Sequence, residues 1–309
     1  MRFVYFGTSQ FAADFLKLLC DKNIIPELVV STPDVHSGRG LKLQSSPVKS
    51  CAAEKEIPCI TPQDLSDPRC TKKIQDLGAD LFVVVSYGKL IPHKMLSSAG
   101  KFPLGVHPSL LPRLRGAAPI QWSLINGEAV TGVTVFVIDE KIDSGPILVQ
   151  EKLVIHKDDD YFSLCRRLVA LGVECIVGAL RLLSSEKYEL IEQDKAQSTY
   201  SRKLKKSDGK INWRKRAKDI VNLIRGTKEW PGAYTFHKGK PIKIIQAVEA
   251  QSCECPPSPG IITVKEGMLY VRAGDIAVAV LRLKPAGKKE MPAESFLNGY
   301  RVKTGDRFE

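Results

Sequence analysis

The histidine at position 107 and the aspartate at position 143 are side chains suited to moving protons. His107 directly follows the apolar segment 102–106 (FPLGV), which is typical of a buried strand. It should therefore lie at the carboxyl end of a strand, where open α/β sheets bind ligands. Asp143 lies in the turn DEKIDSGP at 139–146, between two apolar segments. A lone histidine is often structural, and an aspartate in such a turn often bonds only its own backbone. As a pair, however, a carboxylate and an imidazole can transfer protons during acyl transfer.

Other common catalytic patterns are missing from the sequence. There is no G-x-S-x-G motif, and no Ser-His-Asp or Cys-His arrangement stands out, so no covalent intermediate is expected. The turn GTSQF after the first apolar run has one glycine instead of G-x-G-x-x-G, so NAD is not inferred. The eight cysteines include only a C-x-C pair at 253–255. We expect reduced cytoplasmic thiols and no metal.

Apolar runs and amphipathic segments alternate over the first 190 residues. Strands are expected at 2–7, 26–32, 79–88, 102–107, 131–139 and 145–155. Helices are expected at 9–22, 46–56, 67–78 and 160–185. The run 79–88 (ADLFVVVSYG) is nearly all apolar, as in a central parallel strand covered on both faces. This order predicts an open, mostly parallel, Rossmann-like α/β sheet as a domain at 1–190.

The composition changes after that domain. Residues 191–207 are polar and basic, which is typical of a linker. Short apolar runs separated by turn sequences such as HKGK, KEGM and RAGD then fill residues 208–309. They predict a small OB-like β-barrel. A chain of 309 residues is long enough for two such domains.

The charge is distributed unevenly along the chain. Residues 201–309 carry 23 Lys and Arg but 11 Asp and Glu, so the whole net charge of +12 lies in the last third. Such asymmetry favours a docking surface for a polyanion, above all nucleic acid, although a merely soluble basic domain is the alternative. We find no apolar run long enough to span a bilayer and no signal peptide at MRFVYFGTSQ. A cytoplasmic protein without membrane contact is expected.

Longer stretches of the sequence carry a family resemblance. HPSLLPRLRGAAPIQ followed by TGVTVFVIDEKIDSGPIL resembles the formyltransferases that use 10-formyltetrahydrofolate. The segments VVSTPDVHSGRGLKLQSSPVK, YSRKLKKSDGKINW and PAGKKEMPAESFLNGYRVKTGDRF are similar to the methionyl-tRNA formyltransferases in particular. These matches run from the start of the chain to its last few residues.

The resemblance implies a mechanism and its residues. The α-amine of methionyl-tRNA attacks the formyl carbon of 10-formyltetrahydrofolate, a cosubstrate, without a covalent enzyme intermediate. His107 and Asp143 then manage the proton that leaves the amine and help to stabilise the tetrahedral intermediate. The resemblance places the folate at two segments, which are Ser109, Leu110, Leu111 and Pro112, and Ser86, Tyr87 and Gly88. Without it, Leu110 and Leu111 fit a pocket wall or plain packing equally well.

Gly105 departs from the family pattern. The resemblance places an asparagine two residues before the histidine, and its amide is expected to donate a hydrogen bond to the developing oxyanion. Losing one such donor typically costs about 10²–10³ in rate. An ordered water in the vacated space, or a neighbouring amide, can take its place. We expect an active but slower enzyme, in which Gly105→Asn raises the single-turnover rate if a donor is missing.

The resemblance also implies contacts with initiator methionyl-tRNA. Arg39 matches the arginine of an inserted loop that enters the acceptor stem, and Lys42 lies beside it. Further contacts are expected in the linker and in the last loop of the barrel, at Arg202, Lys203, Lys205, Lys206, Lys210, Lys288 and Lys289. Lysines on phosphates position an RNA without reading its bases and make binding salt-dependent. For each of them alone, a solvated surface charge is the alternative.

Two other functions remain open. A formyltransferase acting on an amino sugar or another small amine shares the amino-terminal motifs but has no need of a basic barrel. A tRNA-binding pseudoenzyme is supported by Gly105 alone. We expect the protein to be a monomer.

Overall fold

The computed structural model describes residues 1–37, 42–251 and 255–309. The chain packs as two compact units. The first comprises 1–116, 130–154 and 165–200, and the second comprises 117–129, 155–164 and 201–309. The expected linker at 191–207 contains the crossing point between Tyr200 and Ser201. Two segments of the expected first domain, 117–129 and 155–164, pack with the second unit.

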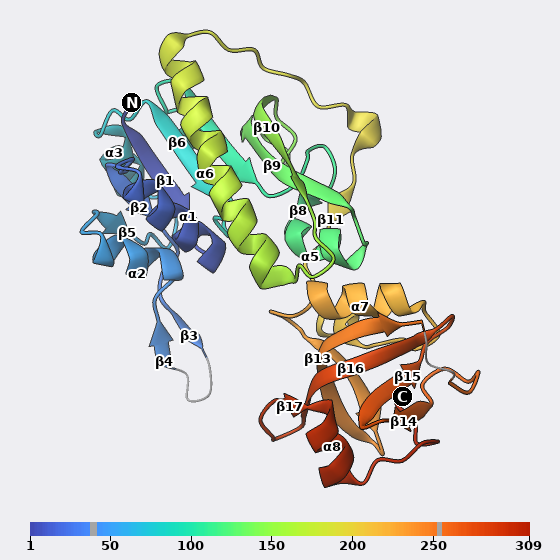
Figure 1. Cartoon of the computed structure of the whole chain (residues 1–309). Helices are drawn as coiled ribbons and strands as arrows, with labels where there is room; N and C mark the ends of the chain where they lie inside the picture. Colours follow the sequence, from blue (N-terminus) through green and yellow to red (C-terminus); the bar gives the residue numbers. More distant parts are fainter. Residues whose placement is uncertain (38–41, 252–254) are drawn as a thin grey trace. The chain divides into compact units, whose positions relative to one another are not determined.

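A seven-stranded sheet forms the centre of the first unit, in the order β10-β9-β7-β6-β1-β2-β5 (Figure 1). Its strands are β1 (Phe3–Gly7), β2 (Leu28–Val30), β5 (Cys59–Ile60), β6 (Leu81–Val85), β7 (Phe102–His107), β9 (Val130–Val137) and β10 (Ile147–Val154). The neighbours from β5 to β7 are parallel, whereas β9 pairs antiparallel with β7 and with β10. The expectation of an open, mostly parallel, Rossmann-like sheet is confirmed.

Helices flank this sheet, and three of them begin at side-chain caps. They are α1 (Gln10–Asp21), α2 (Pro47–Glu54), α3 (Pro68–Gln75), α4 (His93–Leu96) and α6 (Tyr161–Ser185). Ser9, Ser46 and Asp67 accept backbone N–H bonds at the starts of α1, α2 and α3. Such caps satisfy donors that have no partner within the helix.

The alternating residues of β1 show how the two faces of the sheet are covered. Val4 and Phe6 pack in a cluster with residues of α3 and α4. Tyr5 points to the other face, where its hydroxyl donates to the carbonyl of Ala12 in α1 at 2.6 Å. Strand residues alternate between faces, so this register divides the core into two layers.

Helix α6 lies over the sheet beside α1 (Figure 1). By length and composition alone it could cross a membrane, so the expectation that no apolar run is long enough was wrong. Its buried residues recur at helical spacing, at Leu164, Leu168, Val169, Val173, Ile176, Ala179 and Leu183. A Cβ at Gly172 would lie 2.8 Å from the Phe15 ring of α1 and 3.6 Å from Val133 of β9. This spacing is typical of a core helix packed on a sheet.

Short elements complete the first unit and the crossing segment. The hairpin β3 (Val35–Ser37) and β4 (Lys42–Gln44) projects from the sheet (Figure 1). The others are β8 (Arg115–Gly116), which pairs with β11 (Tyr200–Ser201), and the 3-10 turns η1 (Lys195–Gln197) and η2 (Lys206–Gly209).

An antiparallel sheet in the order β12-β13-β16-β15-β14 forms the second unit, with β17 paired to β16. The elements of this unit are α5 (Pro119–Ile125), α7 (Ala217–Gly226), β12 (Ala233–His237), β13 (Lys240–Ala250), β14 (Ile262–Lys265), β15 (Met268–Arg272), β16 (Ala277–Pro285), β17 (Met291–Pro292) and α8 (Ala293–Tyr300). Ile220 and Ile224 of α7 share one buried core with strand residues and with Phe296 of α8.

The last residues of the chain bond to both outer strands of this antiparallel sheet. Phe236 of β12 and Glu309 exchange two backbone hydrogen bonds, at 3.3 and 2.9 Å. On the β14 side, Ile262 N–H donates to the Asp306 carbonyl at 2.7 Å. Segment 305–309 therefore supplies partners to two strand edges that would otherwise be open. This arrangement is compatible with the expected OB-like barrel, which stays a prediction.

Candidate functional site

His107 is the last residue of β7, and its imidazole is held from both nitrogens. Nε2 lies 2.9 Å from the carbonyl oxygen of Leu114. A carbonyl can only accept, so Nε2 carries the proton in that bond. Nδ1 lies 3.6 Å from Oδ2 of Asp143, and both side chains are largely buried. Nδ1 is therefore the nitrogen at which a proton can be taken up next to a carboxylate. The structure brings together the two residues that the sequence singled out.

Asp143 lies in the turn between β9 and β10 with a left-handed backbone, φ +52°. This conformation is costly for a residue with a side chain and persists when the surroundings hold it. One restraint is the Gly116 N–H, which donates to Oδ2 at 2.8 Å. The same oxygen faces His107, so the turn aims this carboxylate at the imidazole.

Gln193 supplies further restraints that no motif indicated. Its Nε2 donates to the carbonyl oxygens of Asp143 at 3.0 Å and of Gly145 at 2.7 Å. Its Oε1 accepts from the buried guanidinium of Arg115, at 3.1 Å from Nε and 2.6 Å from Nη2. A charged donor strengthens such bonds. Gln193 thus links the segment after the histidine to the turn that carries the aspartate.

The expected folate loop follows His107 directly. Ser109 and Leu111 are buried, while Leu110 and Pro112 are partly buried. Ser109 Oγ donates to the carbonyl of Arg113 at 2.6 Å, which closes the loop on itself. These contacts fix the loop beside the imidazole.

Thr134 on β9 braces the same loop and was missed by the sequence analysis. Its hydroxyl donates to the Ser109 carbonyl at 2.7 Å and accepts from the Leu111 N–H at 3.1 Å. Gln150 on β10 donates to the Thr134 hydroxyl at 2.8 Å and to the Leu111 carbonyl at 2.9 Å. Thr134 is the cross-strand partner of His107, so one ladder position holds both the histidine and the loop.

The other expected folate segment, Ser86 to Gly88, follows β6. Ser86 has φ +47°, and Gly88 is exposed. The Tyr87 ring instead packs edge-on against Phe6, with centroids 5.6 Å apart, in the core. Burial raises the pKa of Tyr87 to about 12, so its phenol is neutral near pH 7. The Tyr87 side chain is thus part of the core, whereas Ser86 and Gly88 are exposed.

No vacated space lies above Gly105. A Cβ built there would lie 2.5 Å from two ring carbons of Phe136 and 3.3 Å from Ile138. Phe136 is the direct cross-strand partner of Gly105 on β9, and its side chain is buried. An aromatic ring folded over a cross-strand glycine is a known way to cover such a residue. A side chain introduced by Gly105→Asn therefore meets the Phe136 ring, while the group that takes the place of the asparagine amide, a water or a neighbouring amide, stays a prediction.

The expected RNA contacts differ in their surroundings. Arg39 lies outside the described residues. Lys42 begins β4, where its backbone pairs with Ser37. The other lysines, at positions 203, 205, 206, 210, 288 and 289, are exposed. The Lys210 ammonium lies over the Phe236 ring, 5.5 Å from its centroid.

Arg202 is engaged within the second unit. Its guanidinium makes two hydrogen bonds of 2.7 Å to the Asp208 carboxylate. It also lies 4.9 Å from the centroid of the Trp122 ring, and Trp122 Nε1 donates to the Arg202 carbonyl at 2.7 Å. The exposed Arg202 side chain therefore connects the Asp208 carboxylate with the Trp122 ring.

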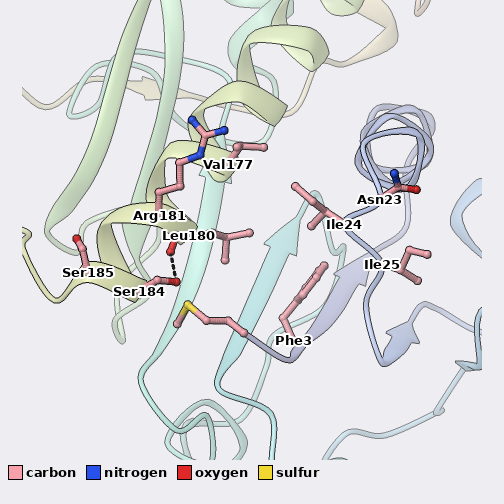
Figure 2. Close-up of a pocket in the computed structure, with 10 residues that line it drawn as sticks. Phe3, Asn23, Ile24, Ile25, Val177, Leu180, Arg181, Ser184 and Ser185 are labelled. Carbon is pink, nitrogen blue, oxygen red and sulfur yellow. Dashed lines mark hydrogen bonds between the residues drawn. The ribbon is translucent and has the colours of Figure 1, made fainter.

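Within the described residues, no three His, Cys, Asp or Glu side chains gather to hold a metal ion. Nor do the seven described cysteines form a disulfide, and Cys253 lies outside that part of the chain. A hollow of about 750 Å³ lies where β1 begins, lined by Phe3, Ile25 and Arg181 among others (Figure 2). Since β1, β6 and β7 are parallel, it lies at the opposite end of the sheet from His107 and includes none of the expected site residues.

Comparisons with known proteins give matches along nearly the whole chain. Residues 1–180 match the family described as formyl transferase, and residues 203–301 match its C-terminal domain. The chain is 38% identical over 305 residues to a methionyl-tRNA formyltransferase of Thermodesulfovibrio yellowstonii, covering 98% of this chain and 97% of that one. It is also 38% identical over 308 residues to one of Geobacter sulfurreducens, covering 99% and 96%.

Solved structures share the fold at lower identity. An N-formyltransferase of Helicobacter canadensis, in complex with folinic acid and dTDP-3-aminofucose, has a TM-score of 0.67 at 19% identity, covering 91% of this chain and 98% of that one. HypX of Aquifex aeolicus, in complex with tetrahydrofolic acid, has a TM-score of 0.65 at 17% identity and covers 98% of this chain and 48% of that one. The matches to both domain families and to relatives over nearly their full length decide the assignment. The chain belongs to the formyl transferase family and, within it, to the methionyl-tRNA formyltransferases.

Proposed function

We propose that the chain transfers the formyl group of 10-formyltetrahydrofolate to the α-amine of initiator methionyl-tRNA, giving formylmethionyl-tRNA for translation initiation. The observation that carries the residue assignment is the contact of His107 Nδ1 with Asp143 Oδ2 at the end of β7. A proton acceptor next to a buried carboxylate suits a reaction in which an amine must lose a proton as it attacks.

His107 and Asp143 are sufficient to move the proton that this reaction transfers. The amine nitrogen attacks the formyl carbon and a tetrahedral intermediate forms. The amine then gives up a proton toward His107 Nδ1, and Asp143 stabilises the resulting imidazolium. The C–N bond to the folate breaks, and N10 leaves with a proton returned from the imidazole. The Nε2–H bond to the Leu114 carbonyl keeps the ring oriented throughout.

The loop at 109–112 and the main chain of 86–88 are the proposed folate contacts. Thr134 and Gln150 hold the first of them in one conformation before any ligand arrives, which lowers the cost of binding. A thermal-shift titration with 5-formyltetrahydrofolate tests this part by itself. We expect the melting temperature to rise with ligand concentration.

The second unit is the proposed docking surface for the tRNA. Residues 201–309 hold the whole net charge of +12 and expose the lysines named above. Arg39 and Lys42, from the β3–β4 segment, complete the proposed contacts. Because lysines contact phosphates, affinity should fall steeply with salt.

One assay decides among the candidate functions. With 10-formyltetrahydrofolate as donor, we compare methionyl-tRNA, free methionine and an amino-sugar nucleotide as acceptors. Turnover of methionyl-tRNA at a kcat/KM at least 100-fold above the other two supports the proposal. Preferential turnover of a small amine would assign the chain to small-amine formylation. Binding of tRNA and folate without turnover would make it a pseudoenzyme.

We further propose that the protein acts as a cytoplasmic monomer. Sedimentation of the free protein tests the oligomeric state, and a concentration-independent mass near 34.2 kDa is expected. A dimer mass at micromolar concentration would contradict it.

A further inference from the structure

The face of the sheet next to the imidazole is built from two short stretches of β7 and β9. Gly105 and His107 are two residues apart on β7, so they lie on one face. Phe136 and Thr134 are their cross-strand partners on β9. These four positions are two neighbouring cross-strand pairs. His107 and Thr134 form the polar half of this group, and Gly105 and Phe136 form the apolar half.

The ring of Phe136 fills the apolar half completely. Two of its carbons lie 2.5 Å from the place where a Cβ at residue 105 would be, so a side chain at residue 105 requires the ring to move. Phe136 is 4% exposed and belongs to a cluster with Leu111 and Ile147, against which Ile138 packs. One ring therefore covers the glycine and supports the loop residue that follows His107.

We infer that Phe136 is a positioning residue of this catalytic centre. Its ring occupies the volume that a side chain at position 105 would take. There it provides an apolar support for Leu111 in place of a polar group. The inference rests on the proposed function and deepens it. Positions 105 and 136 share one volume, so a side chain at either one sets what the other can be. The amide that position 105 lacks should be restored most readily when the ring is shortened.

A double-variant cycle tests the shared volume without any substrate. The variants are Gly105→Asn, Phe136→Val and the two combined, since valine lacks the two ring carbons that block residue 105. Gly105→Asn alone should lower the melting temperature by several degrees. The combined variant should melt above Gly105→Asn, although it carries one more change. A melting-temperature loss equal to the sum of the single losses would overturn the inference.

A matched control uses the neighbouring residue on the same strand. Val135 is buried and pairs with Val106, so its side chain points to the opposite face of the sheet. Gly105→Asn combined with Val135→Ala should show additive losses in melting temperature. Rescue by Val135→Ala as well would mean that any loosening of β9 suffices, and it would overturn the specific role of the ring.

Formylation kinetics test the positioning role. We expect Phe136→Val to raise the KM for 10-formyltetrahydrofolate about fivefold or more, because Leu111 loses its support. Gly105→Asn should lower kcat/KM at least 10-fold. The kcat/KM of the combined variant should be at least 10-fold higher than that of Gly105→Asn. Its kcat should also be higher than that of Phe136→Val. Thermal rescue without any gain in kcat would reduce Phe136 to a packing residue and refute the positioning role.

These outcomes remain separable from failure of the proposed function. If the unaltered protein does not formylate methionyl-tRNA, the proposed function fails in that assay. The melting temperatures still decide whether positions 105 and 136 share one volume. The shift of the melting temperature by 5-formyltetrahydrofolate, compared between Phe136→Val and the unaltered protein, still decides whether the ring supports the folate loop.

Discussion

Gln193 and Asp143 are joined by a hydrogen bond of 3.0 Å from the side-chain amide of the first to the main-chain carbonyl of the second, across 50 residues of sequence. The same amide reaches Gly145, and its oxygen accepts from Arg115. Asp143 has a left-handed backbone, so the position of its carboxylate depends on what holds the turn. The orientation of the proposed catalytic carboxylate is therefore decided partly by a segment outside the motif that contains it.

Replacing Gln193 by alanine should impair catalysis more than binding. The turn would lose two restraints, and misplacement of a catalytic group by about 1 Å can cost roughly 10²-fold. We expect kcat to fall about 10- to 100-fold while the KM for 10-formyltetrahydrofolate changes less than threefold. The matched control is Gln197→Ala, because Gln197 is exposed and bonds only locally to Asp194. Equal effects of the two variants would contradict a positioning role for Gln193.

Asp143→Asn should separate charge from geometry. The amide oxygen can still accept from the Gly116 N–H, so the turn keeps this restraint. The negative charge facing His107 Nδ1 is lost, and the imidazolium is no longer stabilised. We expect kcat to fall about 10²- to 10⁴-fold, as for removal of general acid–base assistance. Circular dichroism and the melting temperature should change little, and retention of more than a tenth of the activity would argue against this role.

The exposed lysines of the linker at 191–207 should contribute to the affinity for tRNA but not to the stability of the fold. Lys203, Lys205 and Lys206 are exposed. Changing any one to alanine should weaken tRNA binding and reduce the slope of log K against log salt by roughly one, because one phosphate is no longer neutralised by the protein. Their melting temperatures should stay within about a degree of the unaltered protein. An unchanged salt slope would make that lysine a solvated surface charge.

Arg202 should behave differently, with a dependence on pH. Its hydrogen bonds lower the pKa of Asp208 below the ordinary 3.8, against a smaller opposing effect of burial. A carboxyl with a lowered folded-state pKa stabilises the fold above its unfolded pKa, and this stability is lost as pH falls through the folded pKa. Asp208→Asn should therefore lower the melting temperature at pH 7. The difference from the unaltered protein should shrink as the pH falls below about 4.

The control for that pair is the more exposed ion pair of Arg216 and Asp219, three residues apart at the start of α7. Exposed pairs contribute little, so Asp219→Asn should change the melting temperature by about a degree or less. A difference for Asp208→Asn that does not shrink in acid would show that the carboxylate charge is not what stabilises this part of the chain.

Several features follow from the order of residues alone. The run 79–88 is nearly all apolar, which predicts a central strand covered on both faces. It contains β6, whose residues are almost all buried. Ser9, Ser46 and Asp67 each stand before an amphipathic run and cap three helices, because capping is decided within a few residues. The expectation that no apolar run is long enough overlooked α6, whose length and composition would suit a spanning helix as well as a core helix.

Contacts between distant segments lay beyond such local reasoning. Gln193 lies in a stretch with no regular periodicity, so nothing in the local pattern brings its amide to the 143–145 turn. The segments 117–129 and 155–164 read as parts of the first domain, yet they pack with the second unit. Arg225, for example, donates to the carbonyls of His156, Lys157 and Asp159.

The sequence by itself determined the alternation of strands and helices, the candidate pair for proton transfer and the basic last third, because periodicity, side-chain chemistry and charge are properties of the chain. Only the tertiary structure decided what surrounds Gly105. In the sequence the glycine reads as a missing side chain. In the fold, the register of β9 against β7 places the Phe136 ring in that volume. Register is set by pairing between strands, so it cannot be read from either strand alone.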